Sequence, residues 1–185
     1  LLRVQTRTGA ALDLLLGLGP LIALTAGLAL GERPAPASVA WLLLALLFAY
    51  SRVDLRQIDW RGCRAAWQRT LLLTAFIGVV IVVAARLSTQ MPELDAERAA
   101  LYLPFVLLQQ LLLLGYLLPR ARALVPGHAA ALAAVLFALP HAPNFSLMVG
   151  SGLVAWLWAR LFLRYRAPLP IALSHYLLGL TAVFW

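Results

Sequence analysis

The chain has 185 residues, of which 63% are hydrophobic and 12% charged, and its mean hydropathy is +0.89. Such a composition lies far outside the range of a soluble domain of this length, so it predicts a polytopic membrane protein. All fifteen basic residues are arginines, and the formal net charge is +8. Because these arginines fall between apolar segments and form no continuous basic face, we expect no nucleic-acid partner.

Apolar segments follow one another along the whole chain. Taking about 20 apolar residues as one membrane span, we predict seven spans, at residues 9–31, 35–50, 70–86, 99–118, 126–142, 145–162 and 167–185. The fold class is therefore all-α, a polytopic membrane helical bundle with about seven transmembrane helices. The second, third, fifth and sixth segments are short, which indicates local thinning of the bilayer or helices that end inside the protein around a cavity.

No repeat or linker divides the sequence, so we expect a single membrane domain over residues 1–185. Within it, residues 1–69 would form two N-terminal helices and a basic cytoplasmic loop, and residues 70–185 would form the core. The loop, residues 51–69, carries arginines together with Trp60 and Trp67, and is typical of a segment that lies on the membrane surface. It also holds the single cysteine, Cys63, which excludes an intrachain disulfide.

The arginines predict the orientation of the protein. With the N-terminus in the cytoplasm, twelve of the fifteen lie on the inner side, and only Arg33, Arg86 and Arg98 lie on the outer side. This bias predicts a multi-pass protein of the cell (inner) membrane. Asp13 is the only carboxylate within a predicted span. It lies near the inner end, where it can reach headgroup water, and this favours a structural role over a functional one.

Polar side chains interrupt three of the later segments. Gln109 and Gln110 lie in the middle of the fourth, His141 lies at the outer end of the fifth, and His175 lies in the first half of the seventh. A polar group buried without a partner costs about 2–7 kcal/mol. We therefore expect these groups to face one another or a shared wet cavity, which by the predicted topology opens toward the outer half of the bilayer.

The order and spacing of these residues resemble the CPBP family of intramembrane proteases, which includes the type II CAAX prenyl endopeptidases and the bacterial lysostaphin-resistance and immunity-type relatives. The family pattern is a Glu-Glu pair with Arg four positions after the second Glu, then Phe-x-x-x-His, then His-x-x-x-Asn. The corresponding motifs here read Gln109-Gln110-Leu-Leu-Leu-Leu114-Gly-Tyr-Leu-Leu-Pro119, Phe137-Ala-Leu-Pro-His141-Ala-Pro-Asn144 and His175-Tyr-Leu-Leu-Gly179. The resemblance covers about residues 70–185.

This chain departs from the family pattern at four positions, three of which are charged in the family. Gln109 and Gln110 stand for the Glu pair, Leu114 for the Arg, and Gly179 for the Asn. The resemblance implies that one Glu, with the histidines, activates water for peptide hydrolysis, and that the Arg and Asn support the site. A carboxamide cannot take a proton from water near neutral pH, and no Asp or Glu follows Glu97, so the usual general base is missing.

Several interpretations of the motif residues stay open. His141 or His175 could serve as the base, with a Gln amide donating to the developing oxyanion. The two glutamines could instead only join helices, and Asn144 could be the N-cap of the sixth segment rather than a supporting residue of the site. Two histidines and amide oxygens are poor zinc ligands, so we expect neither a metal nor another cofactor.

Two hypotheses of function follow from the resemblance. The first is a divergent CPBP-type intramembrane endopeptidase, with Gln109, Gln110, His141 and His175 as catalytic residues and Phe137, Asn144, Gly179 and Leu114 in support. The second is a non-catalytic relative, a pseudoprotease, that binds membrane peptides in the same cavity. In both, the partners are the lipid bilayer and a membrane-anchored protein or peptide. A transporter is disfavoured because the amides and histidines have no intramembrane charge partner.

Overall fold

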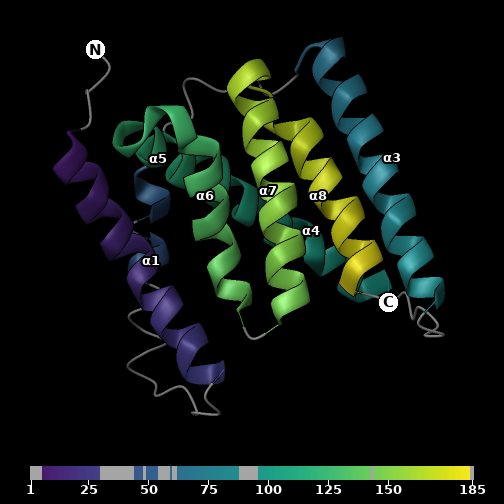
Figure 1. Ribbon diagram of the computed structural model, residues 1–185, viewed down its shortest axis with the longest axis horizontal. Helices are drawn as coiled ribbons and strands as arrows, with labels where there is room; N and C mark the ends of the chain where they lie inside the picture. Colours follow the sequence, from purple (N-terminus) through teal and green to yellow (C-terminus); the bar gives the residue numbers. More distant parts are fainter. Residues whose placement is uncertain are drawn as a thin grey trace. The chain divides into compact units, whose positions relative to one another are not determined.

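The computed structural model describes residues 6–29, 44–47, 49–53, 59, 62–87, 96–142 and 144–183, and every regular element in these ranges is a helix (Figure 1). Backbone polar groups find no water in hydrocarbon, and a helix satisfies them within one segment, as this apolar sequence requires. The helices are α1 (Arg7–Ala29), α3 (Arg64–Leu87), α4 (Ala96–Gln110), η2 (Leu111–Leu117), α5 (Leu118–Leu124), η3 (Pro126–His128), α6 (Ala129–Ala138), η4 (Leu139–His141), α7 (Phe145–Tyr165) and α8 (Pro168–Val183).

Six of the seven predicted segments coincide with these helices. The exception is the second, because most of residues 35–50 lie outside the described ranges, as does Trp60 of the following loop. Within the described ranges, three helices are long and apolar enough to cross a bilayer, at Arg64–Ala84, Tyr102–Leu124 and Phe145–Tyr165, and a shorter apolar helix covers Pro126–His141. The all-helical class is thus confirmed for the described residues and three of their helices could span a membrane, while a bundle of seven spans and a cytoplasmic N-terminus stay predictions.

The third helix begins earlier than its apolar segment. We expected a loop up to residue 69 and a span from 70, whereas α3 begins at Arg64. The first turns of α3 carry Arg64, Gln68 and Arg69. Long polar side chains of this kind extend toward headgroups while their backbone stays helical, so hydropathy alone places the boundary too late.

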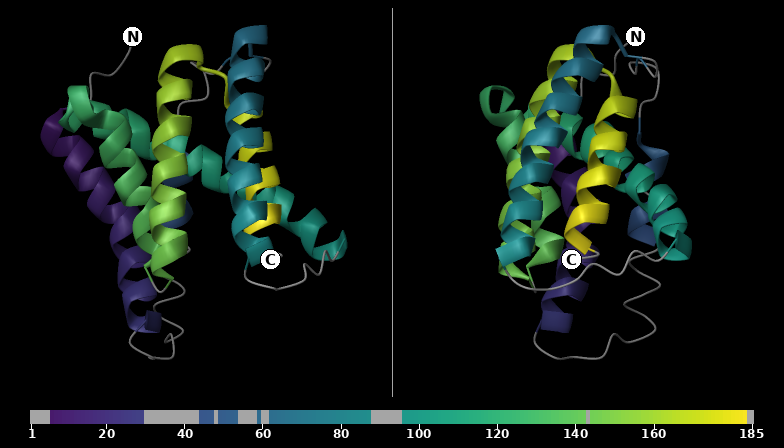
Figure 2. Two further views of the ribbon diagram at one scale, coloured as in Figure 1. Left: turned by 45° about the vertical axis from the view of Figure 1, so that its right-hand side comes forward. Right: turned by 90° about the vertical axis from the view of Figure 1, so that its right-hand side faces the viewer.

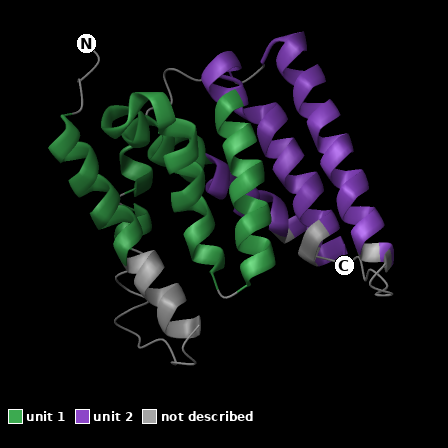
Figure 3. Cartoon of the chain, in the orientation of Figure 1, with its two compact units in different colours: residues 1–55, 111–160 green, residues 56–110, 161–185 purple. Residues whose placement is uncertain are grey.

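The chain forms two compact units, which are drawn in different colours in Figure 3. Unit 1 comprises Leu1–Leu55 and Leu111–Arg160, and unit 2 comprises Arg56–Gln110 and Leu161–Trp185. Each unit thus joins an early stretch of the chain to a late one. The predicted division into residues 1–69 and 70–185 stays a prediction.

In unit 2, α8 packs against both α3 and α4 (Figures 1 and 2). Small polar residues line the contact with α3, where the buried Thr74 hydroxyl lies 2.7 Å from the Ser174 hydroxyl and 2.8 Å from the carbonyl oxygen of Thr70. Small side chains let membrane helices approach closely, and hydroxyls add hydrogen bonds where hydrocarbon offers no alternative. The opposite face of α3 exposes Leu72, Phe76 and other apolar side chains, as a lipid-facing surface does.

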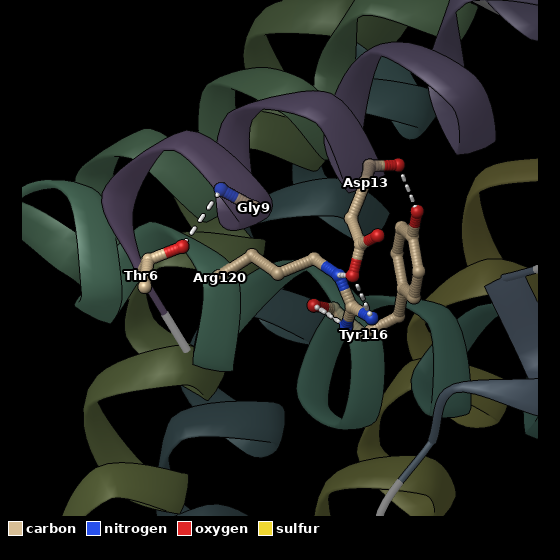
Figure 4. Close-up of polar contacts among 5 residues, drawn as sticks. All are labelled: Thr6, Gly9, Asp13, Tyr116 and Arg120. Atoms are coloured by element: carbon tan, nitrogen blue, oxygen red, sulfur yellow. Dashed lines mark hydrogen bonds and ion pairs between the residues drawn. The ribbon is translucent and has the colours of Figure 1, made fainter. Parts of the chain in front are cut away.

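In unit 1, α1 packs against α5, and a buried charge cluster joins them (Figure 4). Arg120 donates to Oδ2 of Asp13 from Nε at 3.1 Å and from Nη2 at 2.9 Å, and it donates from Nη1 to the carbonyl oxygen of Tyr116 at 3.0 Å. The guanidinium lies 3.7 Å from the centre of the Tyr116 ring, whose hydroxyl donates to the carbonyl oxygen of Asp13. We call Asp13, Tyr116 and Arg120 the α1 lock.

The α1 lock changes the interpretation of Asp13. We expected its carboxylate to reach headgroup water, but that prediction is wrong, because Asp13 and Arg120 are both buried and paired with each other. The ring of Tyr116 also lies so close to Gly17 that a Cβ there would be 2.8 Å from Tyr116 Cζ. A structural role for Asp13, the role favoured from the sequence, is consistent with this packing.

Candidate functional site

A buried pair of polar side chains joins α4 to α8 within unit 2. Gln110, the last residue of α4, places its Nε2 2.9 Å from Nδ1 of His175 on α8. Gln110 is 3% exposed and His175 is 8% exposed, so the hydrogen bond lies away from solvent. The sequence predicted that these two motifs meet, and here the structure brings one residue of each together.

The direction of this hydrogen bond determines the state of the imidazole. Since the Gln110 amide nitrogen can only donate, Nδ1 of His175 accepts and the ring proton lies on Nε2. Oε1 of Gln110 is buried and has no hydrogen-bond partner among the described residues. A buried acceptor without a partner is uncommon in proteins and marks the place of a missing donor. The pair is therefore uncharged, and it carries a buried acceptor on the Gln110 amide.

The helix changes its winding directly after Gln110. Residues Leu111–Leu117 form η2, a wider π-type turn, before the α-helical winding returns at Leu118. Such turns occur often at functional sites, because they change the direction in which successive side chains point. Gln109 is half-buried at the end of α4, and Leu114 in η2 is fully buried. Leu114 thus places hydrocarbon where the family motif has an arginine.

The second motif lies in unit 1, at the end of the shorter apolar helix. The rings of Phe137 and His141 lie 5.9 Å apart at 44°, which agrees with their predicted place on one helical face. Nδ1 of His141 is buried and has no hydrogen-bond partner in the described part of the chain. Oδ1 of Asn144 accepts from the backbone N–H of Leu147 at 3.0 Å, so this side chain caps α7. That His141 joins Gln110 and His175 in one cavity stays a prediction.

The last residue of the third motif contacts a side chain that belongs to none of the motifs. Gly179 on α8 is buried against the side chain of Tyr102 on α4, and a Cβ at position 179 would lie 2.6 Å from Tyr102 Cζ and closer still to the hydroxyl oxygen. The space that a family asparagine would occupy is therefore filled by a phenol from another helix.

Sequence analysis missed both Tyr102 and the α1 lock. A signal for Tyr102 was present, because Tyr102, Val106 and Gln110 recur every four residues and so share one face of α4. Arg120 was counted among the arginines of the inner side, and its partner Asp13 lies 107 positions away in sequence. No local pattern indicates a pairing over that distance.

The described part of the chain is thus an all-helical protein with helices long enough to cross a bilayer and a buried amide–imidazole pair. Residues 99–181 match the family model described as type II CAAX prenyl endopeptidase Rce1-like. The match covers less than half of the chain, and over these residues it supports the resemblance to the CPBP proteases. The matched segment contains Gln109, Gln110, His141, His175 and Tyr102. No curated protein and no solved structure was found that matches the chain.

Proposed function

We propose that this protein is a divergent CPBP-type intramembrane endopeptidase that acts on a membrane-anchored protein or peptide, with the Gln110–His175 pair at its active site. The observation that carries the proposal is the buried hydrogen bond of 2.9 Å between the two side chains, together with the unpartnered Oε1 of Gln110. The family match over residues 99–181 supports the reaction class.

A half-turn of the Gln110 amide, together with exchange of the imidazole proton from Nε2 to Nδ1 through water, makes the pair competent as a base. Oε1 then accepts from Nδ1–H of His175, so Nε2 of the imidazole carries a lone pair instead of a proton. The exchange keeps one hydrogen bond between the same two residues. An amide that orients a catalytic imidazole in this way is the arrangement of the Cys-His-Asn proteases, so a carboxylate is not required for that role.

The proposed reaction uses this state. Nε2 of His175 takes a proton from water while the water oxygen bonds to the carbonyl carbon of the scissile peptide. The imidazolium then gives that proton to the leaving nitrogen, the C–N bond breaks, and a carboxylic acid and an amine are released. A turned Gln110 presents its N–H groups as donors to the developing oxyanion. His141 is the second candidate base, since its Nδ1 has no partner among the described residues.

The direction of the hydrogen bond in the structure favours a second candidate, the pseudoprotease. With Nε2–H on His175 and Oε1 on Gln110, the pair offers one donor and one acceptor, which match the C=O and N–H of a peptide group. In that state neither side chain can accept a proton from water. A non-catalytic relative would hold the membrane peptide in this way without cleaving it.

Purified protein in lipid vesicles separates the two functions. The probes are a quenched fluorogenic peptide with a single membrane span and a second one ending in a farnesylated CAAX sequence. We expect wild type to cleave at least one probe. His175→Ala should lower kcat about 10²–10⁴-fold, which is the typical contribution of a general base. Gln110→Ala should lower kcat by a similar factor, because the His175 imidazole is then no longer oriented. His128→Ala and Gln68→Ala, at exposed positions, are the matched controls.

Two results would contradict the endopeptidase. If wild type cleaves neither probe but photo-crosslinks to the peptide in a manner that His175→Ala abolishes, the pseudoprotease function replaces it. If cleavage survives in His175→Ala and is lost only in His141→Ala, the base is His141 and the Gln110–His175 pair has a binding role.

A further inference from the structure

Position 179 is a place where the structure accepts no side chain. An added Cβ would lie 2.6 Å from Cζ and 2.5 Å from Cε1 of Tyr102, well inside van der Waals contact. Glycine is the residue that allows such an approach. Since Gly179 follows His175 by one helical turn on α8, the Tyr102 hydroxyl lies beside the histidine's own face of that helix.

The phenol ring of Tyr102 is held in place by other aromatic rings. Its centre lies 6.1 Å from that of Phe105, at an angle of 41°, and 6.1 Å from that of Tyr176, in a stacked arrangement at 28°. Tyr176 is itself fixed, because its hydroxyl donates to the carbonyl oxygen of Ala99 at 3.2 Å. Rings packed in this geometry attract one another, so the direction of the Tyr102 hydroxyl is set by its neighbours.

The same helix pair carries Tyr102 and the Gln110–His175 pair. Tyr102 and Gln110 lie on one face of α4, His175 and Gly179 lie on one face of α8, and α4 packs against α8 within unit 2. Cβ positions four residues apart on a helix lie about 5–6 Å from each other. The Tyr102 hydroxyl lies against Gly179, one helical turn from His175. One peptide group is large enough to contact both this hydroxyl and the His175 imidazole. The Tyr102 hydroxyl has no hydrogen-bond partner among the residues that the structure describes.

We propose that Tyr102 is a substrate-binding residue of this site, whose hydroxyl donates a hydrogen bond to the carbonyl oxygen of the bound peptide from the space left by Gly179. The inference rests on the proposed function, because it assigns a further group to the same site. A phenol donates one hydrogen bond from a rigid ring, and that bond strengthens as the carbonyl oxygen gains negative charge during attack by water. Tyr102 on α4 thus takes the place of the asparagine that the family motif has at position 179 on α8.

Tyr102→Phe removes the hydroxyl and keeps the ring, and Tyr176→Phe is its matched control. The Tyr176 hydroxyl bonds to a backbone carbonyl of α4, so its loss affects packing alone. With the fluorogenic probes, we expect Tyr102→Phe to lower kcat about 10²–10³-fold and to change KM little, as is typical of a lost oxyanion donor. Tyr176→Phe should keep kcat within about threefold of wild type. Equal kcat values for the two variants would overturn the inference.

A second experiment exchanges the two side chains. Tyr102→Ala should inactivate the protein, and Tyr102→Ala combined with Gly179→Asn should regain activity, because an amide donor then occupies the space from α8. Gly179→Ala alone should lower the thermal midpoint in wild type but not in the Tyr102→Ala background, where the ring is absent. Equal lowering of the midpoint in both backgrounds would show that Tyr102 does not occupy this space.

These measurements keep the failure of the inference apart from the failure of the proposed function. If wild type cleaves and His175→Ala does not, the endopeptidase stands and Tyr102→Phe decides the role of the hydroxyl. If wild type cleaves neither probe, the endopeptidase fails, and photo-crosslinking of the single-span peptide decides instead. Tyr102→Phe must then reduce crosslinking relative to both wild type and Tyr176→Phe, and equal crosslinking would overturn the inference.

Discussion

Replacing Asp13 by Asn would test the α1 lock with almost no change in shape. The carboxylate accepts two hydrogen bonds from Arg120, and the side chains are 12% and 4% exposed, respectively. At 2.9 Å and an effective dielectric constant of about 20, the attraction between the two charges is about 6 kcal/mol. Part of this repays the cost of burying both charges, and removing one partner of a buried pair typically costs about 3–5 kcal/mol.

The remaining contacts of Arg120 reduce that cost. Its guanidinium keeps the ring of Tyr116 at 3.7 Å and the hydrogen bond to the Tyr116 carbonyl oxygen at 3.0 Å. A cation over an aromatic ring contributes about 0.5–2 kcal/mol, and the Asn amide oxygen still accepts one bond. We therefore expect Asp13→Asn to lower the free energy of unfolding by about 3 kcal/mol. For a chain of this size, that corresponds to a fall in the thermal midpoint of about 6–12 °C.

Thermal unfolding in detergent, followed by tryptophan fluorescence, measures this effect. Asp59→Asn is the control, because Asp59 is exposed and its Oδ1 accepts from the backbone N–H of Gly62 at 3.2 Å, a bond that the Asn oxygen can still accept. The double variant Asp13→Leu with Arg120→Met should recover most of the loss, since an apolar pair leaves no buried charge. A midpoint for Asp13→Asn equal to that of Asp59→Asn, or a double variant as unstable as the worse single one, would refute the lock.

Three further predictions concern single positions. Gln110→Glu should raise the rate of probe hydrolysis at least about tenfold, because a carboxylate beside His175 stabilises the imidazolium that forms when the ring takes water's proton, and an unchanged rate would mean that residue 110 does not act on the base. Gly17→Ala should cost about 1–3 kcal/mol of stability by overpacking against the neighbouring ring, whereas Gly19→Ala, with nothing within 4 Å of its Cβ, should not destabilise the protein. Arg166 has a left-handed φ of 55°, so Arg166→Gly should stabilise the protein by about 1 kcal/mol, while Arg164→Gly inside α7 should destabilise it by a similar amount in the same unfolding assay.

The helices were predictable because a membrane leaves the backbone few options. Apolar length alone placed six segments, since each must satisfy its own hydrogen bonds. The ends of helices depend instead on polar side chains with apolar stems, as the early start of α3 at Arg64 shows. Hydropathy assigns such residues to loops, although their backbone continues the helix.

The sequence predicted the motif residues of the candidate site, but it did not predict the contacts between side chains on different helices. The spacing of the motifs indicated that Gln110 and His175 belong together, and their hydrogen bond agrees with that interpretation. Tyr102 belongs to no motif, and its importance follows from a contact with Gly179 that requires a particular packing of α4 against α8. Similarly, Asp13 and Arg120 were both placed near the inner face, but depth in the membrane does not specify which side chains meet.

Positions 110 and 114 are both uncharged in this chain, whereas the family motif has a glutamate at the first and an arginine at the second. Gln110 and Leu114 are buried, so an arginine at position 114 or a glutamate at position 110, each alone, would be an unpaired charge away from water. Replacing both by neutral side chains avoids that cost, which a change at one position would not. The structure retains a buried charge pair elsewhere, between Asp13 and Arg120, where both members are present and satisfied. The fold thus tolerates buried ions when they are matched, so the neutral Gln110–His175 pair reflects the requirements of this site rather than a general exclusion of charge from the helices.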